Sequence, residues 1–165
     1  TLLCPFKAPL NDRLKDIRFN QASKITSLEF MNSLDSTITD KVENFKLCLI
    51  KAQKGEAEAQ YHLGWMYRQG TKVIQDYKKA VKWYTKSATQ GFVSSQTQLG
   101  VMCELGWGIS EDSKLAAKWY RKAADQNDTL AQLRLASLYR QGKGVVKNIK
   151  EAERWYLKSA SHDGD

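Results

Sequence analysis

The feature that most restricts the fold of this chain is a motif that occurs three times at a constant interval. The octapeptide LGWMYRQG begins at Leu63, LGVMCELG at Leu99 and LASLYRQG at Leu135, so the copies start 36 residues apart. A period of about 20–50 residues is typical of arrays in which each repeat is one supersecondary unit. Such a unit cannot bury its apolar face alone and has to stack on its neighbours. The chain is therefore predicted to be a repeat protein.

Three units, residues 57–92, 93–128 and 129–164, align without insertion or deletion. The aligned columns carry glutamine, leucine, glycine, alanine, a Trp-Tyr pair and lysine. They are Gln60, Gln96 and Gln132; Leu63, Leu99 and Leu135; Gly70, Gly106 and Gly142; Ala80, Ala116 and Ala152; Trp83-Tyr84, Trp119-Tyr120 and Trp155-Tyr156; and Lys86, Lys122 and Lys158.

The spacing within each unit predicts two helices. In the first unit, apolar residues at three-and-four spacing predict a helix over about 57–69. Gly64 is a small residue on that stripe and predicts close approach of a second helix. Gly70 is in position to end the first helix, and Asp76 to cap the start of the second. Stacked pairs of this kind predict an all-α fold, a right-handed α/α superhelical solenoid of about three 36-residue helix-turn-helix repeats.

Two departures from the repeat pattern occur at the joins between helices. Lys72 stands in the column where the other units have Gly108 and Gly144, which predicts a different first inter-helix loop. The second unit ends in Asn127-Asp128, where the first ends in Gly-Phe.

The chain before the first unit is less regular. Residues 40–56 are predicted to form a degenerate half-repeat helix, because Ala52 and Gly55 align with Ala88 and Gly91. Residues 1–39 match nothing in the repeats, and we expect a divergent segment of short helices, a cap or a partly ordered arm. The last residues of the chain resemble the join between two repeats, and the terminal unit of a solenoid usually needs a polar cap. We therefore expect further repeats to follow residue 165 in the natural protein.

The repeat pattern closely resembles the Sel-one-like repeat (SLR) family, a relative of the tetratricopeptide repeats. A plain tetratricopeptide array fits less well, because its unit has about 34 residues and a late proline. The residues that carry the resemblance in the first unit are Ala57, Ala59, Gln60, Leu63, Gly64, Met66, Tyr67, Gly70, Lys79, Ala80, Trp83, Tyr84, Lys86 and Ala88.

The resemblance implies a non-catalytic scaffold or adaptor that binds a protein or peptide in the concave groove of its repeats. The resemblance also implies a broad range of roles, because the family includes adaptors in endoplasmic-reticulum protein degradation, activators of cell-wall synthases, bacterial exopolysaccharide and envelope assembly factors, and secreted bacterial proteins that bind host components. An alternative function is a regulatory module of an envelope or cell-wall enzyme. Another is an electrostatic binder of an acidic surface.

The composition is that of a soluble globular protein, but it does not establish the compartment in which the protein acts. Hydrophobic residues make up 42% of the chain and no apolar run is long enough to span a membrane. The opening TLLCPFKAPL does not resemble a signal peptide, because its apolar run is short and is interrupted by Lys7. The three cysteines are widely spaced, which favours a reducing compartment over a disulfide framework. A secreted or envelope-associated location stays open.

No pattern in the sequence indicates catalysis, a cofactor or a metal site. His62 and His162 are far apart, and no nucleophile motif, phosphate-binding glycine loop or metal-ligand spacing accompanies them. The sequence does not indicate an oligomeric state. The chain is therefore predicted not to be an enzyme.

The predicted binding surface is carried by the first helix of each unit. Trp65 is our leading candidate for a partner anchor, because its column runs Trp65, Val101, Ser137 and stacking therefore does not require tryptophan there. The alternative is that Trp65 packs under the N-terminal segment, since tryptophan is usually largely buried. The positions that the resemblance places in the groove are Glu58, Tyr61, His62, Trp65, Arg68 and Gln69; Thr97, Gln98, Val101, Glu104 and Leu105; and Leu133, Arg134, Ser137, Arg140 and Gln141.

The second helices carry a row of cations at four-residue spacing, which we call the basic ridge. Its simplest interpretation is the solvated face of an outer helix, with long side chains lying over their own aromatic neighbours. A surface for an acidic partner is the alternative. The tryptophan and tyrosine residues of the repeats are predicted to lie in the core. They are therefore not free to stack on bases, which argues against nucleic acid as the partner. The ridge is Lys78, Lys82, Lys86, Lys114, Lys118, Lys122, Lys150, Arg154 and Lys158.

Overall fold

The computed structural model describes residues 43–161 of the chain. The chain divides into two units, Thr1–Glu43 and Asn44–Asp165, and the description below concerns the second. The short helices expected within residues 1–39 lie outside the described residues. Across residues 43–161 all regular secondary structure is helical, so the predicted all-α class is confirmed.

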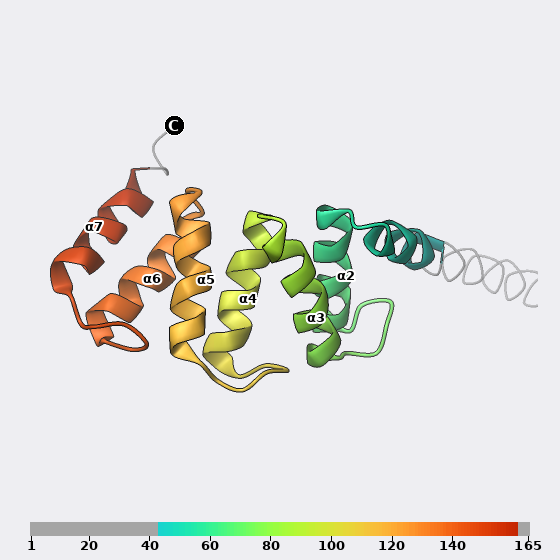
Figure 1. Cartoon of the computed structure of the whole chain (residues 1–165), viewed down its shortest axis with the longest axis horizontal. Coiled ribbons are helices and arrows are strands. Elements are labelled where there is room, and N and C mark those ends of the chain that lie inside the picture. The colour runs from blue at the N-terminus through green and yellow to red at the C-terminus, as the bar shows by residue number, and fades with distance from the viewer. Residues whose placement is uncertain (1–42, 162–165) are drawn as a thin grey trace, which may run out of the picture. The chain divides into compact units, whose positions relative to one another are not determined.

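Three helical pairs follow one another in chain order along the molecule (Figure 1). Each pair corresponds to one 36-residue unit, and each helix packs on the next. Residues 43–53, directly before the first pair, are also helical. The pairs are α2 (Ala57–Gln69) with α3 (Tyr77–Thr89), α4 (Val93–Leu105) with α5 (Ser113–Asp125), and α6 (Thr129–Gln141) with α7 (Ile149–Ala160).

The helix ends form where the capping residues predict them. Gly70 ends α2 in the left-handed conformation, with φ of 71°, and its amide donates to the Met66 carbonyl. At the start of α3 the Asp76 carboxylate accepts from the Lys79 amide at 3.0 Å, which lowers the pKa of Asp76. The same two signals recur at the equivalent positions of the other pairs. Because these caps satisfy backbone groups locally, each helix is limited to 12 or 13 residues by its own sequence.

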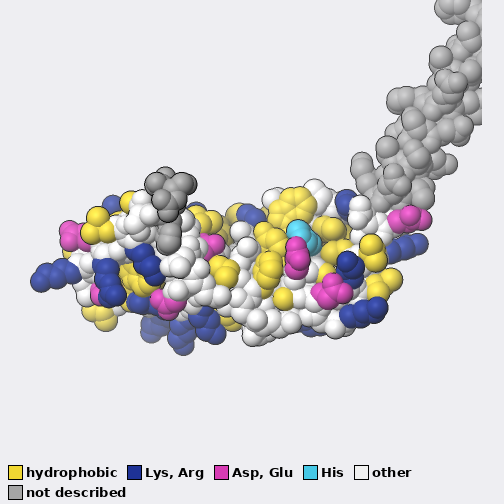
Figure 2. Space-filling view, turned by 90° about the horizontal axis from the view of Figure 1, so that it is seen from above, with side chains coloured by type: hydrophobic (Ala, Val, Ile, Leu, Met, Phe, Trp, Pro, Cys, Tyr) yellow, Lys and Arg dark blue, Asp and Glu magenta, His cyan; other side chains and the backbone are white. Residues whose placement is uncertain are grey.

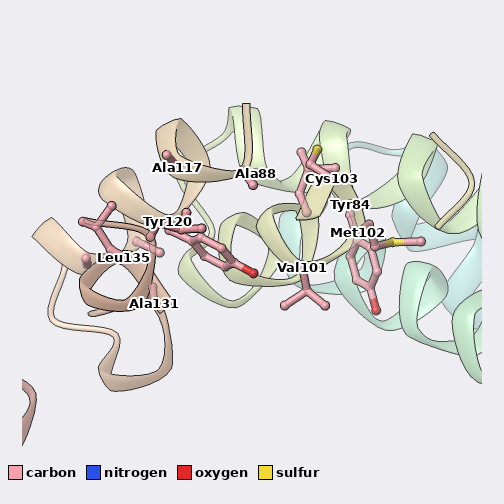
Figure 3. Close-up of a cluster of buried hydrophobic side chains, with 14 of the residues drawn as sticks. Tyr84, Ala88, Val101, Met102, Cys103, Ala117, Tyr120, Ala131 and Leu135 are labelled. Atoms are coloured by element: carbon pink, nitrogen blue, oxygen red, sulfur yellow. The ribbon is translucent and has the colours of Figure 1, made fainter. Parts of the chain in front are cut away.

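A tyrosine and a glycine hold the two helices of a pair together. Tyr84 and Tyr120 are fully buried within the core (Figure 3). Gly64 faces Tyr84, and a Cβ built at Gly64 would come within 2.8 Å of the tyrosine ring. The equivalent distance from Gly100 to the Tyr120 ring is 2.6 Å. Both are closer than a methyl group tolerates, so the tyrosine ring fills the place of the missing side chain.

A buried glutamine joins each repeat to the one before it. The Gln96 Nε2 donates to the Ala88 carbonyl at 3.2 Å, and its Oε1 accepts from Gln126 Nε2 at 2.9 Å. Gln132 donates likewise to the preceding second helix, at the Ala124 carbonyl. Gln60 makes the same bond to the Ala52 carbonyl at 3.1 Å, so the helix at residues 43–53 contacts α2 as α3 contacts α4.

We expect Gln96→Ala to lower the free energy of unfolding by about 1–3 kcal/mol, because it opens a buried space and removes the partner of a buried carbonyl. Gln126→Ala is the control, since Gln126 is exposed and its loss should cost less than about 1 kcal/mol. Urea unfolding followed by circular dichroism measures both. Equal losses would show that the bond into the preceding repeat does not contribute.

The loops between the helices of a pair approach the preceding repeat closely. A Cβ at Gly108 would overlap the backbone of Tyr77, and one at Gly144 would overlap the backbone of Ser113. These glycines thus let a loop rest against the first residue of the previous second helix. Lys72 has φ of 67°, close to the 73° of Gly108, so the prediction of a different first loop is wrong for this residue's backbone. The lysine accepts a left-handed conformation that glycine adopts without strain.

The other departure also preserves the backbone path. Asn127 has φ of 67° and replaces Gly91, which has φ of 92°; asparagine is among the residues that tolerate this region. The following Asp128 accepts from the Ala131 amide at 2.7 Å and caps α6. Phe92, at the same position, makes no side-chain cap and instead packs on Tyr61, with ring centroids 5.3 Å apart.

Candidate functional site

The first helices, α2, α4 and α6, each leave one large apolar side chain exposed among the predicted groove positions. Trp65 on α2 is 39% exposed, Leu105 on α4 is 47% exposed and Leu133 on α6 is 41% exposed. We call these three residues the apolar row. Hydrophobic side chains also lie beside the histidine on the face drawn in Figure 2. The row provides one apolar contact point per repeat.

Tyr61 and His62 flank this surface at the start of the solenoid. Tyr61 is half-buried between Tyr84 and Phe92, with ring centroids 5.9 and 5.3 Å away. His62 is exposed, and its Nε2 lies 3.8 Å from a carboxylate oxygen of Glu58 one turn earlier. Tyr61 therefore serves mainly as packing, and His62 and Glu58 remain accessible.

Polar side chains of the predicted groove link neighbouring first helices. Arg68 Nη1 on α2 donates to Gln98 Oε1 on α4 at 3.0 Å. One repeat further on, Arg134 Nη1 on α6 lies 4.0 Å from Glu104 Oε2 on α4. Both pairs join residues 30 positions apart, so the same two columns face each other at successive joins. These contacts join neighbouring repeats as well as lining the surface.

The sequence analysis missed this pairing, although its signal is present in the aligned units. The two members of each pair are 30 residues apart in the sequence, whereas the repeat period is 36 residues. Comparing each unit with itself at 36 residues does not reveal them. Comparing the end of one first helix with the start of the next would have done so.

Arg68 is more constrained than a free anchor would be. Its guanidinium carbon lies 5.6 Å from the centre of the Trp107 ring, and its Nε is buried without a hydrogen-bond partner among the described residues. Arg140, in the same column of the third repeat, is exposed. Of these two predicted arginines, Arg140 is the one whose charge faces solvent.

Two predicted groove positions offer little surface, which corrects the expectation drawn for them. Val101 is only 9% exposed and Thr97 only 2%, and the Thr97 hydroxyl donates back to the Val93 carbonyl at 3.3 Å. The middle of α4 is thus packed among its neighbours. Exposed or half-exposed positions are Glu58, Tyr61, His62, Trp65, Arg68, Gln69, Gln98, Glu104, Leu105, Leu133, Arg134, Ser137, Arg140 and Gln141.

Glu104 connects this surface to the core. Its Oε2 accepts from the buried Tyr120 hydroxyl at 2.7 Å. Burial, and then this carboxylate, raise the pKa of Tyr120 well above the ordinary value. The hydroxyl therefore stays protonated and remains a donor to Glu104. In the first repeat Arg68 replaces the carboxylate, and the Tyr84 hydroxyl has no hydrogen-bond partner among the described residues.

The basic ridge is divided between packing and solvent. Lys86 and Lys122 lie over the rings of Trp83 and Trp119, 4.6 and 4.5 Å from the ring centres, and Lys158 lies 5.2 Å from that of Trp155. Arg154 pairs with Glu151 at 3.6 Å. The exposed remainder of the ridge is Lys78, Lys82, Lys114, Lys118 and Lys150.

The cysteines in the described part of the chain are poor nucleophiles. Burial, with a smaller contribution from Asp112, raises the pKa of Cys103 to about 11. Burial also raises the pKa of Cys48, against the opposing effect of Lys72 and Lys51. The Cys48 thiol donates to the Ala59 carbonyl at 3.4 Å. Both thiols are protonated near neutral pH, when the thiolate is the reactive form.

Among residues 43–161, no helix combines the length and the apolar character that crossing a bilayer requires.

Comparison with known proteins identifies relatives of the repeats. A putative sel1-like repeat-containing protein of Acanthamoeba polyphaga mimivirus is 48% identical over 48 residues, which are 29% of this chain and 8% of that protein. A protective antigen from uropathogenic Escherichia coli strains, which displays an SLR fold, superposes with a TM-score of 0.70 at 33% identity. The match covers 72% of this chain and 25% of the antigen. This chain therefore spans a small part of the length of these relatives.

Two further structures have the same architecture. A Sel1 repeat protein from Oxalobacter formigenes matches with a TM-score of 0.63 and 38% identity, over 67% of this chain and 45% of that one. Cysteine rich protein B of Helicobacter pylori matches in fold, with a TM-score of 0.58 at 22% identity, over 75% of this chain and 89% of that one. These matches confirm the predicted α/α solenoid. The sequence model of the Sel1 repeat family matches residues 57–92, 93–128 and 129–164, which together are more than half of the sequence. The chain belongs to the Sel1 repeat family.

Proposed function

We propose that this chain is a non-catalytic scaffold that holds an extended segment of a partner protein along α2, α4 and α6, with Trp65 as the main anchor. Sel1 repeat proteins are generally protein-interaction scaffolds. The observation that carries the proposal is the apolar row, Trp65, Leu105 and Leu133, which places an exposed large apolar side chain at a predicted groove position of each successive first helix.

The members of the row lie at different levels of their helices: Trp65 is the ninth residue of α2, Leu105 the thirteenth of α4 and Leu133 the fifth of α6. A partner segment that carries several apolar side chains along its length could contact all three. Trp65 is the strongest candidate because large aromatic side chains dominate the energetics of interfaces. Its column contains Val101 and Ser137, so stacking of the repeats does not depend on the indole.

Polar groups around the row would fix the orientation of the partner. Arg140 and Glu58 are exposed and can donate to or accept from a peptide backbone. Arg68 and Glu104 are held by neighbouring repeats, so we expect them to maintain the curvature of the surface. This arrangement is typical of a site that is formed before the partner arrives.

Selection of a phage-displayed random peptide library on the protein tests the proposal. We expect peptides that carry several apolar residues, and we expect Trp65→Ala to weaken a selected peptide by more than about 1 kcal/mol without lowering the melting temperature. Ile74→Ala is the control, since Ile74 is 90% exposed on a loop outside the row. A lower melting temperature with unchanged affinity would assign Trp65 to packing and contradict the proposal.

Salt separates this function from binding through the basic ridge. Affinity that depends on Trp65 should change little between about 50 and 200 mM salt, whereas binding that depends on many cation contacts falls steeply over this range.

A further inference from the structure

A hollow that is separate from the apolar row lies between α5, α6 and the loop that follows α6. Its volume is about 540 Å³. The floor is formed by Ala117, Leu135, Tyr139 and Val145, and is therefore apolar. None of the residues that line it belongs to the predicted groove, so it is a distinct surface.

The rim of this hollow is entirely cationic. Lys114, Lys118, Arg121 and Lys122 line it, and no acidic side chain does. Within residues 43–161, none of the four forms an ion pair with a carboxylate, although other lysines and arginines do. Lysine and arginine side chains also gather at the α5-to-α7 end of the molecule in Figure 2. The hollow thus combines an apolar floor with positive charge that the chain itself leaves unpaired.

Arg121 and Tyr139 make the join between the second and third repeats different from the join between the first and second. Arg121 donates to the Tyr139 hydroxyl and lies over the Trp155 ring, 5.0 Å from its centre. At the equivalent positions of the preceding join stand Thr85 and Cys103. Arg121 is thereby held in place at the edge of the hollow, so its charge is positioned before any ligand binds.

The spacing of the lysines matches an extended acidic peptide. Lys114 and Lys118 are four residues apart on one helix, which places them about 6 Å apart along its axis. Alternate side chains of an extended chain are about 6.6 Å apart. Carboxylates at alternate positions of a peptide would therefore meet successive lysines.

Nucleic acid fits this surface less well. Its single-stranded forms bind on exposed aromatic rings. Here Lys122 covers the Trp119 ring, and Arg121 covers both Tyr139 and Trp155. The rings are already stacked on cations and are not free to receive bases.

We propose that the hollow between α5, α6 and the following loop binds an acidic segment of a partner protein, in which one apolar side chain enters the hollow and flanking carboxylates pair with Lys114, Lys118 and Arg121. This is a second contact surface, independent of the apolar row.

The test uses the whole chain and a fluorescein-labelled peptide, Gly-Glu-Phe-Glu-Phe-Glu-Gly, with binding followed by fluorescence anisotropy at about 150 mM salt. We expect the double variant Lys114→Glu/Lys118→Glu to raise the Kd at least about tenfold. The matched control is Lys78→Glu/Lys82→Glu, which changes the net charge equally at the same two columns of the first repeat and should alter the Kd less than about twofold. All four lysines are exposed, so both variants should keep the melting temperature of the parent.

Peptide controls separate the two parts of the site. Replacing the three glutamates by glutamine, or the two phenylalanines by glycine, should each weaken binding at least about tenfold. Trp65→Ala should leave the Kd unchanged, which distinguishes this site from the apolar row. Equal losses in the two double variants would show attraction by net charge alone and overturn the proposal. Absence of binding by the acidic peptide, or its displacement by an equimolar ten-residue oligothymidine, would do the same.

Discussion

Replacing Gly108 by alanine is expected to lower the free energy of unfolding by about 2–5 kcal/mol. Two effects add. Gly108 has φ of 73°, where an L-residue costs about 1–2 kcal/mol. The new Cβ would also overlap the Tyr77 backbone, and overpacking costs about 1–3 kcal/mol. The obstacle is main chain at the start of α3, which cannot rotate away as a side chain can.

Gly91→Ala isolates the first effect. Gly91 has φ of 92°, but a Cβ there would meet nothing within 4 Å, so only the cost of the backbone conformation remains. Urea unfolding of the two variants should therefore show a clearly larger loss for Gly108→Ala. If both variants lose the same amount, the close approach of the loop to the preceding repeat contributes nothing to stability. The same comparison made with Gly144→Ala, which meets the Ser113 backbone, should give the same order.

Removing the Tyr120 side chain is expected to have the largest effect of any single truncation in the core, about 3–5 kcal/mol for Tyr120→Ala. The ring is fully buried and occupies the space that Gly100 leaves open between α4 and α5. Its loss opens a cavity at the centre of the middle repeat, on which both neighbours stack. Thermal unfolding by circular dichroism and urea titration both measure it.

Tyr120→Phe separates the ring from the hydroxyl. It removes only the donor to Glu104, so we expect a loss of about 0.5–1.5 kcal/mol. It should also leave Glu104 free to move toward Arg134. If Tyr120→Phe costs as much as Tyr120→Ala, the hydrogen bond rather than the ring would hold the two helices together, contrary to the packing described here.

The outlines of the fold were predictable because each unit carries its own local signals. Gly70 and Asp76 mark the end of one helix and the start of the next through backbone groups only a few residues away. Gly64 could be recognised as a point of close approach from its place on the apolar stripe. Trp65 stays a predicted partner anchor: its column indicates that stacking does not require tryptophan there, and its side chain is partly exposed.

The joins between repeats were not predictable in the same way. Lys72 shows the difficulty, since its sequence departure suggested a changed loop and the backbone is the same. Arg68 was predicted as a groove position beside Trp65, and in the structure it is hydrogen-bonded to Gln98 on the next repeat. Val101 looked accessible from its column and is buried by its neighbours.

The sequence by itself determined the number of repeats, their helices and the caps that end them, because these depend on interactions within a few residues or on a pattern repeated three times. Only the tertiary structure decided which side chains of the first helices are exposed, and that four cations surround an apolar hollow beside α5. Those properties depend on the angle and distance between successive repeats, which side chains 30 residues apart establish together.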